Sequence, residues 1–211
     1  CDEARHRSAS LFYYRYPGKD TGTISGIVRK EFLTVTGDGV HTMRYLLQQD
    51  RRAIMYLAAL EETLGDGLDV VLPAGEKKIV SPYGNHARGS KFLDDSHLID
   101  ATLTRTIDEV CRQIPGFYYG RLDVRYASWD DLKQGKNFVI IEVNGAGSEP
   151  THMYDPRHSL FFAWKEIVRH WIILWRISRM NHRLGHPYLT FREGINMFRE
   201  AKDYDRKLAA M

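Results

Sequence analysis

The pattern of apolar and polar positions predicts alternating strands and helices in the first third of the chain. Apolar residues alternate with polar ones in two early stretches, and a Pro-Gly segment lies between them. A tight turn at Gly37-Asp38-Gly39 then precedes helical spacing, for which His41 or Thr42 would be the N-cap. The predicted elements are strands over 11–16 and 24–35 joined by a turn at 17–22, then helices over 43–49 and 52–64.

The rest of the chain continues with short strands and then longer helices. Ser96 is the expected N-cap of a central helix, which Pro115-Gly116 ends, and Gly185-His186-Pro187 ends a long one. The predicted elements are strands over 68–72 and 77–82, a polar loop over 83–96, a helix over 96–113, strands over 117–126 and 137–143 joined by a loop at 127–136, and helices over 158–184 and 190–210. This order predicts an α+β fold, an antiparallel sheet with packed helices.

Composition narrows the class of protein. The 211 residues are 43% hydrophobic and 27% charged, which suits one substantial domain and excludes a disordered chain or a disulfide scaffold. The net charge is +3 with mixed signs along the chain, so we expect no nucleic-acid partner. The most apolar window, 171–175, is flanked by charged residues, so we expect no membrane partner. The two cysteines, Cys1 and Cys111, indicate a reducing, cytoplasmic compartment, and a homodimer stays open.

Charged and amide side chains gather on the two strands predicted over 117–126 and 137–143. Alternate residues of a strand share a face, so Arg121, Asp123 and Arg125 lie together, as do Glu142 and Asn144. Two carboxylates and an amide oxygen are donors that Mg²⁺ prefers, and arginines on the same face suit a transferring phosphate. The alternative is an ordinary solvated strand face.

These residues resemble the metal-binding end of the ATP-grasp carboxylate–amine ligases. Arg121-Leu-Asp123 is followed nineteen residues later by Glu142-Val-Asn144-Gly145. The family includes the D-alanine–D-alanine ligases, cyanophycin synthetase and the ribosomal-protein glutamate ligases. The resemblance implies Asp123, Glu142 and Asn144 as ligands of Mg²⁺ (Mn²⁺ is an alternative), with ATP as the nucleotide. It implies Arg121 as the catalytic cation, and we add Arg125 from its position on the same face.

Two further stretches resemble the cyanophycin-synthetase-like branch. Val35-Thr-Gly-Asp-Gly-Val-His-Thr42 is similar to its Gly-Asp-Gly-x-x-Thr turn, although Asp-Gly is also a common turn signal. The loop at 85–94 is similar to its Asn-x-x-x-Gly-Gly loop, with an ordinary polar loop as the alternative. Glycines let backbone amides approach phosphates. The side chains compatible with phosphate are Asn85, His86, Arg88 and Lys91.

The loop after Asn144 is the expected substrate loop. The resemblance implies that it helps to hold a substrate carboxylate, with Gly147, Ser148 and Thr151 as the contacts. His152 is a further candidate, which we do not assign as a base because a loop histidine often bonds its own backbone. The family often has Pro-Gly early in this loop, whereas this chain has Ala146-Gly147.

The resemblance covers residues 11–180 and implies an ATP-dependent ligase acting on a small carboxylate and an amine. Because the chain begins with Cys, we expect it to be a piece of a longer protein and inactive alone. Residues 1–185 would be the C-terminal part of an ATP-grasp domain and 186–211 a helical extension. Two alternatives stay open, namely a non-catalytic relative that binds nucleotide or metal, and a basic interaction module.

Overall fold

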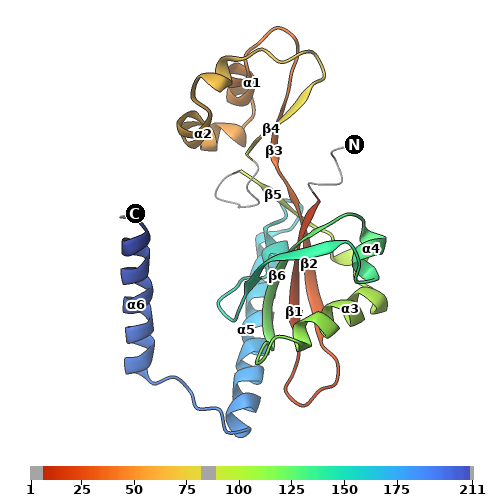
Figure 1. Ribbon diagram of the computed structural model, residues 1–211, viewed down its shortest axis with the longest axis vertical. Coiled ribbons are helices and arrows are strands. Elements are labelled where there is room, and N and C mark those ends of the chain that lie inside the picture. Colours follow the sequence, from red (N-terminus) through yellow and green to blue (C-terminus); the bar gives the residue numbers. More distant parts are fainter. Residues whose placement is uncertain (1–6, 82–88, 210–211) are drawn as a thin grey trace.

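The computed structural model describes residues 7–81 and 89–209 and is built around a five-stranded antiparallel sheet (Figure 1). The strand order is β5-β2-β1-β6-β7. The α+β prediction, an antiparallel sheet with packed helices that ends in long helices, is confirmed. The strands of this sheet are β1 (Ser8–Tyr14), β2 (Thr23–Glu31), β5 (Lys91–Asp94), β6 (Tyr119–Tyr126) and β7 (Phe138–Asn144).

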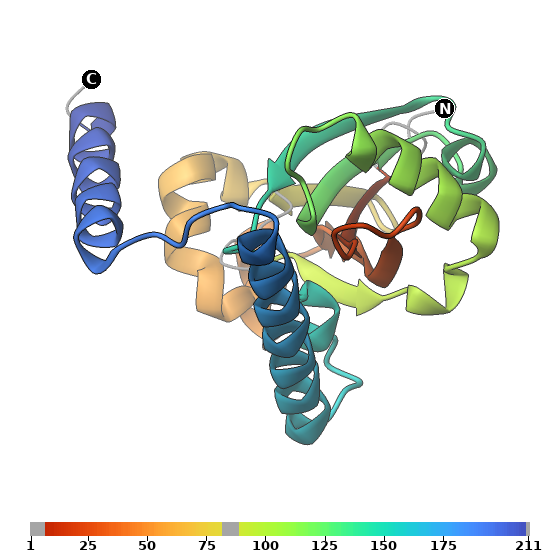
Figure 2. The same cartoon turned by 90° about the horizontal axis from the view of Figure 1, so that it is seen from below.

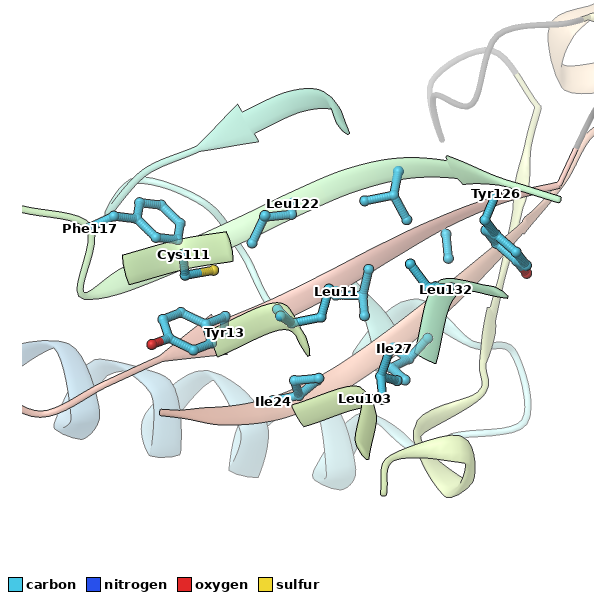
Figure 3. Close-up of a cluster of buried hydrophobic side chains, with 13 residues drawn as sticks. Leu11, Tyr13, Ile24, Ile27, Leu103, Cys111, Phe117, Leu122, Tyr126 and Leu132 are labelled. Atoms are coloured by element: carbon cyan, nitrogen blue, oxygen red, sulfur yellow. The ribbon is translucent and has the colours of Figure 1, made fainter. Parts of the chain in front are cut away.

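Helices α3 (Ala101–Arg112) and α4 (Trp129–Lys133) cover one face of this sheet. Alternate residues of β1, Leu11 and Tyr13, point to this face, and α3 meets them with residues at helical spacing. Figure 3 shows how these side chains interdigitate into one core, in which Leu103, Ile107 and Cys111 of α3 are fully buried.

Helix α5 (Leu160–Arg183) covers only part of the opposite face (Figure 2). Its buried residues Ile173 and Ile177 pack with Phe12 of β1 and Tyr119 of β6. On the same face beyond this contact, Ser8 and Ser10 of β1 and Asp123 of β6 are polar. The uncovered part of this face carries the candidate site.

A smaller lobe follows β2. Strands β3 (Leu33–Thr36) and β4 (Lys77–Ser81) form a two-stranded sheet, against which α1 (Met43–Gln49), η2 (Ala53–Tyr56), α2 (Leu57–Leu64) and η3 (Gly65–Asp69) enclose a second core. The Gly-Asp-Gly stretch is a turn in this lobe, since the amide of Gly37 donates to the carbonyl of Glu76 at 2.8 Å. Asp38 accepts bonds from the amides of Val40 and His41, and Thr42 is the N-cap of α1.

The C-terminal helix α6 (Phe191–Ala209) stands apart from the rest of the chain in both views. His182 near the end of α5 stacks on Tyr188 of the segment before α6, at 3.9 Å between ring centroids. Phe191 and Phe198 of α6 are 86% and 70% exposed. None of the helices in the described ranges has the length and apolar character needed to cross a lipid bilayer.

Several predicted elements are wrong at their ends because side chains serve other partners. Ser96 does not cap α3, since its hydroxyl accepts a bond from the amide of Ile27 at 3.0 Å. The residues 96–98 form the short helix η5 (Ser96–Leu98), and the Asp100 carboxylate caps α3 by accepting from Leu103 N at 2.8 Å. The loop at 127–136 contains α4, which is capped by Ser128.

Other predicted elements are wrong because long-range packing decides them. The strand predicted over 24–35 is two strands, because the chain leaves the main sheet after Glu31 and pairs with β4 from Leu33. The stretch 68–72 is not a strand, since Leu68 and Leu72 fill the second core from a 3-10 turn and an extended segment. The loop predicted over 83–96 contains β5, which pairs with β2. The helix predicted over 52–64 begins as η2.

Candidate functional site

Asp123 is the centre of a polar cluster on the part of the sheet face that α5 does not cover. It lies on β6 directly opposite Ser10 of β1, and the Ser10 hydroxyl donates to its Oδ1 atom at 2.6 Å. Lys30 of β2 reaches across β1 and donates from Nζ to the Oδ2 atom of Asp123 at 2.9 Å. Arg121 donates from Nε to Oδ1 at 3.1 Å. Three strands therefore converge on one buried carboxylate.

The fourth strand brings the other predicted metal ligands to the same place. The register of β6 and β7 sets Arg121 opposite Asn144 and Asp123 opposite Glu142. With the Asn144 amide turned so that both of its atoms are bonded, its nitrogen donates to Glu142 Oε1 at 3.0 Å and its oxygen accepts from Arg121 Nη2 at 3.3 Å. The predicted convergence of Arg121, Asp123, Glu142 and Asn144 is what the strand register produces.

The electrostatics of this cluster favour an ionised Asp123. Its burial would raise the pKa of the carboxyl, but the Lys30 ammonium, the Ser10 hydrogen bond and the Arg121 guanidinium outweigh burial and hold the pKa below its usual range. The side chains of Lys30 and Asp123 are 8% and 7% exposed. A carboxylate with this surrounding stays charged at neutral pH.

Arg125 does not join this cluster. The register of β6 and β7 shifts after Asp123 because β7 has one extra residue there, Ile141, and Arg125 is exposed and opposite Val139 of β7. Within the described residues, it makes no hydrogen bond or ion pair with Asp123 or Glu142. The pairing of β6 with β1 is regular from Tyr119 to Arg125, so the predicted alternation holds and Arg125 shares the face of Arg121 and Asp123. Arg125 lies two residues beyond Asp123 in the direction away from Asn144, which leaves it outside the cluster.

The predicted substrate loop lies next to the cluster but is turned on itself. Ser148 bonds the carbonyl of Gly145 through both its amide, at 3.0 Å, and its hydroxyl, at 2.7 Å. Gly147 and Ser148 line a pocket of about 330 Å³ with Tyr119, beside the strand of Asp123. Thr151 is buried in η6 (Thr151–Tyr154) and does not line this pocket.

The predicted phosphate residues lie elsewhere or outside the described part of the chain. Asn85, His86 and Arg88 fall in the segment 82–88, which the structure does not describe. Lys91 begins β5, opposite Glu31 of β2, and lines a pocket of about 660 Å³ between the sheet and the smaller lobe. Nothing in the described contacts brings Lys91 to Asp123.

Sequence reasoning missed Ser10 and Lys30, the two residues that bind Asp123 from β1 and β2. Lys30 stands in the charged run Arg29-Lys30-Glu31 at the end of an apolar strand, which is indistinguishable in sequence from a solvated strand end. Its partner is 93 residues away, so only the sheet order could have revealed the pair.

A second group of buried polar side chains holds α5 and η6 against the sheet. His152 bonds Glu166 of α5 at 3.1 Å, and both side chains are nearly inaccessible to solvent. His158 bonds Asp94 of β5 at 2.7 Å. Asp155 accepts a bond from the amide of Asp94. These contacts connect the segment after β7 to the far edge of the sheet, and they place His152 in a structural rather than an open position.

The donor types at Asp123 fit a hard divalent cation. Asp123 and Glu142 supply carboxylate oxygens and Asn144 an amide oxygen, which is the kind of set that Mg²⁺ takes together with substrate phosphates. Within 7–81 and 89–209, no group of three or more His, Cys, Asp or Glu side chains is arranged to hold a metal ion, so the third protein donor would be the amide.

Of the comparisons with known proteins, only the one with solved structures found a similarity. No protein-family model matches the chain, and a search of curated proteins gave no match. Among solved structures, a bifunctional glutathione synthetase from Pasteurella multocida is similar, with 14% identity and a TM-score of 0.45. The match covers 79% of this chain and 25% of that one, so the chain spans about a quarter of that protein's length.

Proposed function

We propose that this chain supplies the metal- and phosphate-binding side of an ATP-dependent ligase of the ATP-grasp type. The observation that carries the proposal is the register of β6 and β7, which sets Asp123 opposite Glu142 and Arg121 opposite Asn144. Residues 1–185 would form this side of the ligase, and 186–211 would be an extension that the reaction does not need.

Asp123, Glu142 and Asn144 would hold Mg²⁺ or Mn²⁺, which when bound neutralises negative charge on the phosphates of ATP. The chain's own cations would complete this role. Arg121 is fixed from two sides, by Asp123 and by Asn144, so its guanidinium keeps a set direction without substrate. A cation held in place before the reaction stabilises developing negative charge better than one that must reorient.

The proposed reaction has two steps. A carboxylate oxygen of the first substrate bonds to the γ-phosphorus of ATP and the bond from that phosphorus to ADP breaks, which gives an acyl phosphate. The amine nitrogen of the second substrate then bonds to the carbonyl carbon, the bond to phosphate breaks, and the nitrogen loses a proton. The products are an amide, ADP and phosphate. Arg121 would stabilise both charged stages, and Arg125 would meet phosphate from its exposed position.

The remaining site residues belong to the same proposal. Gly147 and Ser148, beside their pocket of about 330 Å³, would contact the substrates, with Thr151 supporting the loop from its buried place in η6. Lys91, together with Asn85, His86 and Arg88, would approach the ATP phosphates. The substrates would be a small carboxylate and an amine.

One observation favours a second candidate, a relative that binds nucleotide or metal without turnover. Lys30 already occupies one oxygen of Asp123, and the pair is almost completely buried. A buried pair of this kind can be retained for structure alone.

The deciding experiment is Mg²⁺-dependent ADP release by the protein at its full natural length, with and without a pool of amino acids. Glu142→Gln is the test variant and Glu109→Gln, at an exposed position on α3, is the matched control. ADP release that needs the pool, disappears in Glu142→Gln and persists in the control would support the ligase. Nucleotide binding without release would favour the second candidate.

A further inference from the structure

We infer that Lys30 makes this site selective for a divalent cation chelated by a polyphosphate, in preference to the free cation. The inference rests on the proposed function and deepens it, because it assigns the ligand class of the same site to one residue. Lys30 would act as a positioning residue. Its ammonium group would stay bonded to Asp123 until phosphate oxygens replace Asp123 as its acceptor.

The position of Lys30 is the first observation. Its side chain lies across β1, the strand between β2 and β6, and its Nζ atom ends 2.9 Å from Asp123 Oδ2. The side chain is only 8% exposed. A buried ammonium group without water needs an anionic partner, so Lys30 stays paired with Asp123 as long as no other anion is within its reach.

The charge of the cluster is the second observation. Asp123 and Glu142 bring two negative charges, and Lys30 and Arg121 bring two positive charges, so the group is neutral. Both oxygens of Asp123 already accept hydrogen bonds, Oδ1 from Ser10 and Arg121 and Oδ2 from Lys30. A free divalent cation would meet two cations and a carboxylate that is already engaged, so it would bind weakly.

A polyphosphate changes this balance. It brings several negative charges with the metal, and its oxygens can accept from Lys30 in place of Asp123. The ammonium group has three N–H donors on a flexible stem, so it can turn from one acceptor to another.

Arg121 is unsuited to the same exchange. Its Nε atom is bonded to Asp123 and its Nη2 atom to Asn144, so it is held at two points on two strands. Lys30 is held to Asp123 by a single contact. The geometry therefore assigns to Lys30 the exchange of Asp123 for phosphate as hydrogen-bond acceptor. The Oδ2 atom of Asp123 becomes available to the cation only after this exchange.

The test measures metal binding directly, by electron paramagnetic resonance of Mn²⁺ added to the protein at its full natural length with and without the non-hydrolysable ATP analogue AMP-PNP. For the wild type, we expect protein-bound Mn²⁺ only when AMP-PNP is present. Lys30→Met should bind Mn²⁺ alone at least tenfold more tightly than the wild type does, and should bind Mn²⁺–AMP-PNP at least tenfold less tightly. Lys30→Arg should behave like the wild type for Mn²⁺ alone, and Lys136→Met, at an exposed position, is the control.

The outcomes separate the inference from the proposed function. Tight binding of Mn²⁺ alone to the wild type would overturn the role of Lys30 and leave the metal site intact, and this arm needs no variant to fold. Binding that needs AMP-PNP but is unchanged in Lys30→Met would also overturn it. No binding of Mn²⁺ or Mn²⁺–AMP-PNP to the wild type would instead count against the proposed function, and the inference would fall with it.

Discussion

Gly26 of β2 and His152 of η6 touch so closely that a Cβ atom on Gly26 would lie 2.2 Å from Nδ1 of His152. The imidazole therefore packs on the bare backbone of the sheet. Its other nitrogen bonds Glu166 of α5 at 3.1 Å. These two contacts of His152 set the distance between the sheet and α5. They thereby also position the loop that follows β7.

We expect Gly26→Ala to destabilise the protein by roughly 1–3 kcal/mol, the range for overpacking a close contact. The new methyl group would push His152 away from β2 and strain its bond to Glu166. The measurement is the free energy of unfolding in urea. Gly67→Ala is the control, because a Cβ atom there has nothing within 4 Å and its φ is not positive. Equal effects of the two substitutions would contradict the importance of the contact.

The stability of the protein should fall as the pH drops below about 6.5, because of His170. The pKa of His170 is lowered to about 4, chiefly by burial. The nearby Glu166 carboxylate raises it and offsets only part of this effect, and the charges of His152 and Arg169 lower it further. The unfolded chain takes up a proton near pH 6.5 and the folded one does not, so protonation favours unfolding between these values. At about 1.4 kcal/mol for each pKa unit, the loss reaches about 3 kcal/mol.

His170→Phe should flatten this pH dependence. Neither ring nitrogen of His170 has a hydrogen-bond partner among the described residues, and the ring packs edge-on against Phe12 at 4.6 Å between centroids, so a phenyl ring suits the site. We expect the stability at pH 7 to change by about 1 kcal/mol or less. Thermal unfolding from pH 5 to pH 8 measures the difference, with His97→Gln at an exposed position as the control. An unchanged slope in His170→Phe would assign the pH dependence to another group.

The core of the candidate site could be predicted from the sequence because its parts are short-range. Arg121 and Asp123 lie two residues apart on one strand, and Glu142 and Asn144 lie two apart on the strand that follows it. Two consecutive strands usually pair, so alternation alone was enough to bring these four side chains to one face.

Lys30 and Ser10 could not be predicted in the same way, because their contact with Asp123 depends on the sheet order. The first strand of the chain lies in the middle of the sheet, between β2 and β6, and nothing in the local pattern states this. Strand β5 has only four residues, too few for alternation to be recognised, and its identity comes from pairing with β2. The extra residue Ile141 of β7 likewise has no local signal, and it sets which residues of β7 lie opposite Val124 and Arg125.

Removal of residues 190–211 should leave the main fold almost unchanged in stability. The side chains of α6 are exposed or half-exposed where they are described, and none is buried. We expect the free energy of unfolding to change by less than about 0.5 kcal/mol, the usual limit for surface changes. The measurement is urea unfolding of the shortened chain followed by tryptophan fluorescence. A large loss would mean that α6 belongs to the main fold, against the proposed division near residue 185.

Asp123 and Glu142 should differ sharply in stability although they share one proposed role. Asp123 is buried and bonded to Ser10, Lys30 and Arg121, whereas Glu142 is exposed. Asp123→Asn leaves the buried Lys30 ammonium without its anion, so we expect a loss of roughly 3–5 kcal/mol. Glu142→Gln should change stability by less than about 0.5 kcal/mol.

The pH dependence of the two variants follows from the same contrast. The depressed pKa of Asp123 gives stability that is complete above about pH 4–5 and is lost as the pH falls through the folded pKa. Asp123→Asn should therefore lose less stability between pH 5 and pH 3 than the wild type does, and Glu142→Gln should follow the wild type. Urea unfolding at these pH values measures both. Because Asp123→Asn unfolds more easily, a loss of activity in this variant could come from unfolding or from loss of a metal ligand. In the stable Glu142→Gln variant, a loss of activity would come from the metal ligand alone. If Glu142→Gln proved as unstable as Asp123→Asn, the exposed carboxylate would have a structural partner, and its use as a probe of metal binding would end.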